Sequence, residues 1–194
     1  MSAELTTKRP ITLDDLNNVD WWDGYKKMEI VDSDWYFGGE PFYRSHSPYA
    51  GWMQSKLMLS MWQHLEQYKS GQVYTGSVGY VLEGQRDNIQ LMRRTDISFV
   101  LKENFPSNKW EPYYCAPDFA IEIISEDLPD DIIRRRDDFL GHGTQQVWQI
   151  VPDDEQIIVY LPNGTSTKYG VDDTIAGGEL LSGFELDVSK VFES

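Results

Sequence analysis

The sequence predicts an α/β fold in which a mixed central β-sheet is flanked by two main helices, with β-hairpins at the periphery. Apolar residues recur at helical spacing over 47–68, and a second helical segment spans 130–142. Residues 118–124 form an apolar run that is typical of a strand buried on both faces. Because the segment 130–142 follows this strand and precedes another apolar run at 147–151, we expect it to cross from one strand to the next.

A short helix and a hairpin are expected near the N-terminus. Thr12 is a suitable N-cap with Asp15 three residues later, which predicts a helix within 11–23. Two strand-like runs follow, at 28–31 and 35–37, on either side of a polar turn. This pattern is typical of a β-hairpin.

The longest predicted helix spans 47–68 and begins at the Ser47-Pro48 signal. Gly71 closes this helical region. His64 is more typical of a packed or surface histidine than of a metal ligand, because no second His or Cys lies at helical spacing from it. The apolar stripe consists of Met53, Leu57, Met61, Leu65 and Tyr68, widened by Trp52, Met58 and Trp62.

Small residues interrupt the next strand-like run, 73–82. Gly76, Ser77 and Gly79 predict a bulge or a close backbone approach within it. A polar and aromatic segment, 102–114, is expected to be a surface loop that could cover a site. The remaining predicted elements are a turn at 83–88, strands at 89–92, 97–101, 147–151, 157–160, 166–169 and 184–186, and a helical turn at 191–192.

The length and composition predict one globular domain over residues 1–194. Seven Trp, eleven Tyr and eight Phe supply apolar area for a core, while charged residues make up 25% of the chain. Cys115 is the only cysteine, which excludes an intrachain disulfide and a thiolate metal cage. With no signal-peptide pattern and no apolar run long enough to span a membrane, we expect a soluble, cytoplasmic protein without a membrane partner.

The net charge of −15 argues against general coating of nucleic acid, because such proteins gain affinity through a basic surface. A net charge does not exclude a local basic strip. The alternative interpretation of each basic run is ordinary solvated surface. The candidates for a strip are Arg93, Arg94, Arg134, Arg135 and Arg136, together with Lys26 and Lys27.

Acidic residues lie at or near several predicted strands: Glu29, Asp96, Asp118 and Glu122. Burial of an unpaired carboxylate costs several kcal/mol, so Glu122 should be protonated, paired with a nearby arginine or bound to a metal. Glu29 could instead face solvent, and Asp96 could be a strand cap or turn residue. Carboxylates that converge at a strand edge suit a hard cation such as Mg²⁺, which prefers oxygen ligands.

Five strings that occur in order resemble the motifs of one nuclease family. MEIVDSDWYF resembles YELIDGE, RRTDISFV resembles RPDVAFV, and APDFAIEIISED resembles PDLVVEVLSPS. DDIIRRRDDFLGHGTQQVWQIVP and LLSGFELDVSKVFES are similar to the blocks that follow in that family. On these motifs the chain resembles the Uma-type putative restriction endonuclease family, within the PD-(D/E)xK nuclease superfamily. The resemblance covers almost the whole chain and implies a restriction-endonuclease-like fold.

The resemblance also implies a set of site residues. Asp96 matches the superfamily's Asp, Glu122 the acid of (D/E)xK, Glu29 the acid of the first motif and Asp118 the proline-linked Asp. It implies Mg²⁺ or Mn²⁺ held by Asp96, Glu122 and Asp118, DNA as substrate and, by analogy, a homodimer. The family's basic residue falls at Arg135, where lysine is expected.

Arginine at this position changes the chemistry that is available, because it stays charged and cannot act as a general base. It can still stabilise charge on a phosphate. The other departures are Glu126 for proline, Phe139 for tyrosine, Thr144 for valine and Val151 for aspartate. We expect the last three to be nearly neutral changes of packing or surface.

Three functional hypotheses follow. The leading one is a divalent-metal-dependent endonuclease in which Glu29, Asp96, Asp118, Glu122 and Arg135 form the catalytic set. The second is a catalytically impaired protein that keeps the nuclease fold and acts as a binding or regulatory module. The third is hydrolysis of a small phosphorylated substrate, which suits the charge of −15 better than duplex DNA does.

Overall fold

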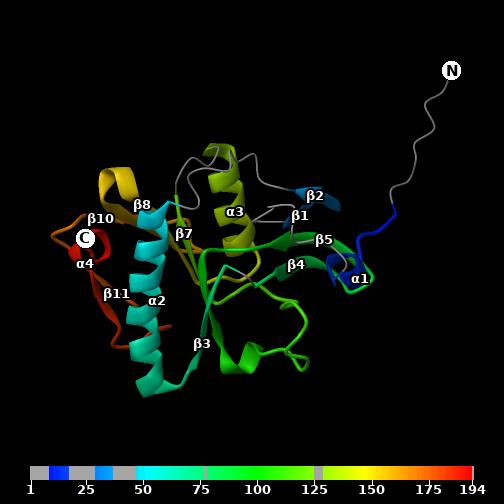
Figure 1. The fold of residues 1–194 in the computed structure, drawn as a ribbon, viewed down its shortest axis with the longest axis horizontal. Coiled ribbons are helices and arrows are strands. Elements are labelled where there is room, and N and C mark those ends of the chain that lie inside the picture. Colours follow the sequence, from blue (N-terminus) through cyan, green and yellow to red (C-terminus); the bar gives the residue numbers. More distant parts are fainter. Residues whose placement is uncertain (1–8, 18–28, 37–46, 77, 125–128, 194) are drawn as a thin grey trace.

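The computed structural model describes residues 9–17, 29–36, 47–76, 78–124 and 129–193 (Figure 1). Its main element is a six-stranded sheet in which β7 and β8 pair in parallel and the other described neighbours pair antiparallel. The predicted mixed sheet is therefore confirmed. In spatial order its strands are β10 (Ser166–Tyr169), β9 (Gln156–Tyr160), β8 (Gln146–Val151), β7 (Phe119–Ile123), β6 (Ile97–Leu101) and β3 (Gly71–Thr75).

A second sheet contains four antiparallel strands, and residues 94–96 connect one of them to β6 of the first sheet. The first two strands of this sheet along the chain pair antiparallel and confirm the predicted β-hairpin. α1 (Leu13–Asn17) precedes this sheet and begins with the predicted cap, since Thr12 Oγ1 accepts a hydrogen bond from Asp15 N at 3.3 Å and Thr12 N donates to Asp15 Oδ2 at 2.8 Å. The expected continuation of that helix to Asp23 lies outside the described residues. The sheet's strands are, in order, β2 (Asp34–Tyr36), β1 (Glu29–Val31), β5 (Asn88–Arg93) and β4 (Tyr80–Gln85).

One predicted strand is wrong, because the run 73–82 is divided between the two sheets. β3 ends at Thr75 in the six-stranded sheet, and β4 begins at Tyr80 in the four-stranded one. At Gly76 an added Cβ would lie 3.6 Å from the carbonyl oxygen of Thr95, so the chain passes close to the β5 to β6 connection as it changes sheets. The small residues mark this change of sheet. Ser77 lies outside the described residues.

The turn expected at 83–88 is also shorter than predicted, since β4 continues to Gln85 and β5 begins at Asn88. Gly84, with φ of +102°, accommodates an irregular register between the two strands. Near the C-terminus the expected strand lies one residue later than predicted. It pairs with a strand that the sequence did not predict. These are β12 (Glu185–Asp187) and β11 (Thr174–Ala176), followed by α4 (Ser189–Phe192).

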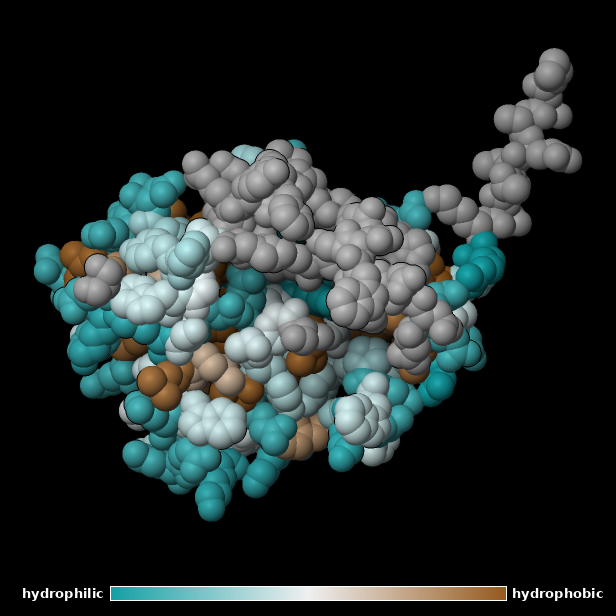
Figure 2. Space-filling view, in the orientation of Figure 1, coloured by the Kyte–Doolittle hydropathy of each residue, from teal (hydrophilic) through white to brown (hydrophobic). Residues whose placement is uncertain are grey.

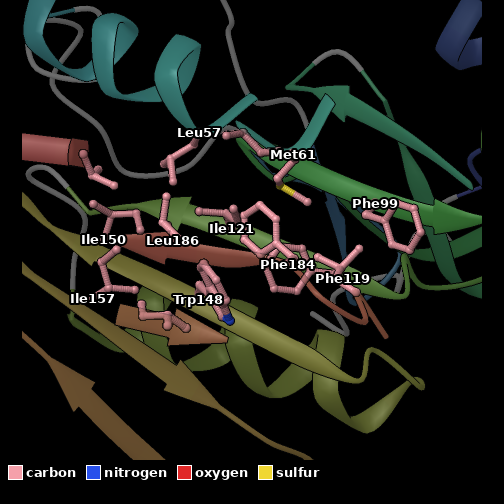
Figure 3. Packing of buried hydrophobic residues seen from close by; sticks show 14 of the residues in the cluster. Leu57, Met61, Phe99, Phe119, Ile121, Trp148, Ile150, Ile157, Phe184 and Leu186 are labelled. Carbon is pink, nitrogen blue, oxygen red and sulfur yellow. The ribbon is translucent and has the colours of Figure 1, made fainter. Parts of the chain in front are cut away.

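The helix α2 (Pro48–Tyr68) covers one face of the six-stranded sheet. Its N-cap Ser47 accepts a hydrogen bond from Ala50 N at 3.0 Å, which confirms the predicted start. Figure 3 shows Leu57 and Met61 of α2 over the side chains of the strands. Each buried side chain of this size contributes about 1.5–3 kcal/mol. The α2 stripe packs on Phe119, Ile121, Ile123, Trp148 and Ile150.

The helix α3 (Pro129–Gly141) lies between β7 and β8 in the chain and packs on the opposite face. Phe139 is fully buried there with Ala120 and Val147. Side chains alternate along β7, so Ala120 and Glu122 face α3 while their neighbours face α2. This alternation directs Glu122 toward the helix that carries the arginines. Of the helices that the structure describes, none has the length and apolarity needed to cross a membrane.

Candidate active site

Asp96 and Glu122 come together at one end of the central sheet. Ile97 of β6 pairs with Ile121 of β7, so one further step along this antiparallel register places Asp96 beside Glu122. The carboxylate Oδ2 of Asp96 accepts a hydrogen bond from the backbone N–H of Ile123 at 2.8 Å. Two acids predicted from distant parts of the sequence are therefore neighbours.

The connection from β5 to β6 is fixed by polar contacts on both sides. Thr95 Oγ1 donates to the carbonyl oxygen of Ile121 at 2.7 Å. From α2, Gln54 Nε2 donates to the backbone carbonyl oxygen of Asp96, also at 2.7 Å. Gln54, which the sequence did not indicate, thus links the longest helix to the candidate site.

Glu29 is fully buried and is surrounded by basic groups. Its Oε2 lies 2.7 Å from Arg93 Nη1, and its Oε1 accepts a hydrogen bond from Arg94 N at 3.0 Å. The guanidinium of Arg135 approaches the same Oε1, with Nε at 3.5 Å. The alternative of a solvent-facing Glu29 is excluded.

Arg135 joins Glu29 to Glu122. Its Nη1 lies 3.3 Å from Glu122 Oε2, and both side chains are 4% exposed. Of the states considered for Glu122, the described contacts show pairing with a cation. Buried pairs of this kind contribute little net stability by themselves, but they leave an uncompensated charge when one partner is removed.

Arg93 forms a second clamp, between β5 and α3. Its side chain is 2% exposed, and its Nε donates to Asp138 Oδ2 at 2.7 Å while its Nη1 contacts Glu29. Asp138 lies three residues after Arg135 on the same helix, and residues at this spacing share a helix face. Arg93 and Asp138 therefore help to hold α3 in the position that directs Arg135 toward the acids. The sequence offered no signal for Asp138 beyond this spacing.

Asp118 lies at the other end of β7. It is four positions along the chain from Glu122, a distance of about 13 Å in an extended strand. Its Oδ2 accepts hydrogen bonds from Leu101 N at 2.8 Å and from Asn104 Nδ2 at 3.1 Å. The structure does not bring Asp118 together with the other acids, and these contacts give its carboxylate a structural role. A metal-ligand role for it stays a prediction.

The arginines predicted as a DNA-contacting strip do not form an exposed surface. Arg93, Arg94 and Arg135 are buried. Arg134 contacts Asp32, with Nη2 to Oδ2 at 2.7 Å. Arg136 pairs with the neighbouring Asp137 and lies over the ring of Tyr160. The interpretation failed because runs of adjacent arginines on a strand end and a helix point in different directions, several of them into the protein.

Two other expectations are resolved by the structure. His64 is packed, stacking on Tyr68 at 4.4 Å between ring centroids and meeting Phe184 edge-on. Burial lowers the pKa of its imidazole. The loop 102–114, which could have covered the site, leaves from the end of β6 opposite Asp96 and then packs on β4, where Val81 N donates to the carbonyl oxygen of Tyr113 at 2.7 Å.

A family model described as "Putative restriction endonuclease" (Uma2) matches residues 25–189. The chain belongs to the Uma2 family. It is also similar to the crystal structure of a putative nuclease belonging to DUF820 from Anabaena variabilis, with 19% sequence identity and a TM-score of 0.75. That similarity covers 94% of this chain and 98% of the other and shows a shared fold. A search of curated proteins found no match.

The donor set of this Uma2 family member fits a hard cation with few protein ligands. Across the described ranges no group of three or more His, Cys, Asp or Glu side chains is placed to hold a metal. Mg²⁺ commonly takes one or two carboxylates and completes its shell with water and substrate phosphate. Asp96 and Glu122 are the two carboxylates that would hold such an ion, and Arg135 on Glu122 is the group with which it would compete.

Proposed function

We propose that this Uma2 family member is a divalent-metal-dependent endonuclease that hydrolyses phosphodiester bonds of DNA. The observation that carries the proposal is the juxtaposition of Asp96 and Glu122 at adjoining strand ends, with the cationic side chain of Arg135 beside them. Carboxylates next to a fixed cation are suited to bind an ion and an anionic phosphate together.

The residues have separate roles in this proposal. Asp96 and Glu122 would hold Mg²⁺ or Mn²⁺, and the bound ion would lower the pKa of water and stabilise charge on phosphoryl oxygens. Arg135 donates hydrogen bonds to the phosphate but takes no proton, because arginine remains charged. Glu29 orients Arg135 through their contact in the buried cluster. The proton of the attacking water therefore leaves to solvent or to the substrate.

A second candidate function is a binding or regulatory module without cleavage activity. The observation that favours it is the contact of Arg135 with two acids, Glu29 and Glu122. This cluster balances the charge of Glu122 from within the protein. A stable ion pair at the metal position would preserve the fold while keeping the cation out.

Cleavage of supercoiled plasmid with Mg²⁺ or Mn²⁺ tests the proposal. We expect the wild type to cut the plasmid. The cleavage rates of Glu122→Gln and Asp96→Asn should each be at least 100-fold lower. Glu103→Gln is the matched control, because it removes an exposed acid at the other end of β6 and should leave cleavage unchanged. Arg135→Lys should raise the rate, since lysine at this position can lose its proton. If neither the wild type nor Arg135→Lys cuts, the module is the better description.

Calorimetry with Mn²⁺ separates metal binding from catalysis. Heat of binding that Glu122→Ala abolishes supports the endonuclease, whereas no heat in the wild type supports the module. We further propose a homodimer, since two copies could cut both strands. Sedimentation tests the oligomeric state, and conversion of plasmid to the linear form without a nicked intermediate is the product expected of such a pair.

A further inference from the structure

A groove runs from the candidate site along α2 and β3. Figure 1 shows these two elements side by side, and the groove between them has a volume of about 680 Å³. Gln54 lines its upper end and also donates to the backbone of Asp96. Gly76 lines the same end, where an added Cβ would lie 4.0 Å from the carbonyl oxygen of Asp96. One end of the groove therefore borders the backbone of Asp96.

The wall contributed by α2 is apolar and exposed. Met58, Leu59 and Trp62 line the groove, with Leu59 57% and Trp62 50% exposed. Figure 2 shows brown and pale atoms gathered among teal ones over the part of this face where α2 and β3 lie. Large apolar side chains left exposed together on a polar surface mark a place where something binds.

Trp62 also lines a second hollow of about 310 Å³ on its other side. Lys69 and Lys102 lie in that hollow, together with the ring of Phe105 and with Glu66 as the acid. In a chain with a net charge of −15, two lysines lie beside the exposed ring of Trp62 and the partly buried ring of Phe105. Aromatic platforms with nearby cations are the features that bind single-stranded nucleic acid.

We propose that this groove binds single-stranded nucleic acid, with Trp62 as a platform on which a base stacks and Lys69 and Lys102 as phosphate contacts. The inference rests on the proposed nuclease function and names the form of its substrate. Duplex binding depends on many phosphate contacts, and the buried side chains of Arg93 and Arg94 do not add to the one proposed for Arg135. Single strands gain affinity through stacking and need fewer cations.

The helix geometry sets the length of strand involved. Trp62 is eight positions after Gln54 on α2, which corresponds to about 12 Å at about 1.5 Å per residue. Nucleotides stacked about 3.4 Å apart would cover this distance in three to four steps. The base that stacks on Trp62 is therefore three to four nucleotides from the end of the groove at Gln54.

Fluorescence anisotropy with a labelled 12-nucleotide single strand and its duplex tests the proposal, in EDTA so that no cleavage occurs. We expect the wild type to bind the single strand at least 10-fold more tightly than the duplex. Trp62→Ala should weaken single-strand binding about 5- to 150-fold, the range expected for loss of one stacked base. Trp62→Phe, which keeps a ring, should retain most of the affinity.

Trp110→Ala is the matched control, because Trp110 is 83% exposed but lines neither of the two hollows. It should bind as the wild type does. Equal affinity of Trp62→Ala and the wild type, preference for the duplex, or absence of binding would each overturn the proposal. So would a change in sedimentation of Trp62→Ala without a change in affinity, since the groove would then be covered by a second copy of the chain.

The plasmid assay distinguishes this failure from failure of the proposed function. If cleavage depends on metal but Trp62 has no role in binding, the proposed endonuclease function is supported and the proposed single-strand groove is refuted. Binding that depends on Trp62, without cleavage under any metal, removes the endonuclease and keeps the groove.

Discussion

Substitution Glu29→Gln should destabilise the protein by about 3 kcal/mol. Removal of one charge from a buried ion pair costs about 3–5 kcal/mol, because the partner stays buried without compensation. Here Arg93 keeps its contact with Asp138, and Arg135 keeps its contact with Glu122, which places the expected loss at the lower end. For a chain of this length, about 3 kcal/mol corresponds to a decrease of about 6–12 °C in Tm.

Thermal and urea unfolding followed by circular dichroism measure this loss. The control is Glu111→Gln, whose partner Arg86 lies at 2.6 Å, as close as Arg93 is to Glu29. That pair is solvent-exposed, with Arg86 55% exposed, and exposed pairs contribute about 0–1 kcal/mol. Equal shifts of the two variants would refute the reasoning, because burial and not distance is the claimed cause.

Three further outcomes are expected. Gly71→Ala should destabilise the protein by about 1–3 kcal/mol, because the added Cβ would lie 2.2 Å from a backbone oxygen. Gly51→Ala should stabilise the protein by about 0.5–1 kcal/mol, because the position lies within α2 and has open space for a Cβ. Urea unfolding measures both changes. Asp118→Ala should lower the free energy of unfolding by about 1–3 kcal/mol, because the N–H of Leu101 loses its acceptor. It should leave Mn²⁺ binding unchanged in calorimetry, and loss of that binding would instead support the predicted metal role of Asp118. Burial, and then the charge of Asp118, raises the pKa of the Cys115 thiol. The contribution of this thiol to stability is therefore full below about pH 8.5 and is lost as the pH rises through the folded-state pKa. At pH 8.5 the thiol of the folded protein should react more slowly with Ellman's reagent than the thiol of the protein unfolded in urea.

The elements that sequence patterns predicted well are those whose signals are local. α2 begins at the residue after Ser47 because its cap is encoded within four residues, and its stripe identifies the buried face. The run 73–82 was misassigned because alternation describes a strand but not the sheet to which it belongs. That choice depends on β5 and β6, which lie later in the chain and approach at Gly76.

The candidate site was only partly accessible to sequence reasoning. Asp96 and Glu122 could be paired because both border apolar strands and match the family motifs. The burial of Glu29 could not be foreseen, since it depends on β1 pairing with β5 and on α3 bringing Arg135 across from another part of the chain. The prediction of a basic strip from adjacent arginines was wrong, because adjacency in the sequence does not specify which side chains point inward.

Arginine at position 135 links stability and chemistry in a way that lysine would not. Its planar group reaches Glu29 and Glu122 together, with separate nitrogens on each acid, and it carries its charge at every pH at which the protein folds. A lysine is a single point charge and cannot span the two contacts in this manner. Arg135→Lys should therefore weaken the internal pairing, lower the Tm and release Glu122 to bind Mn²⁺ more tightly. A lower Tm together with unchanged Mn²⁺ affinity would show that Arg135 holds the fold but does not compete with the ion.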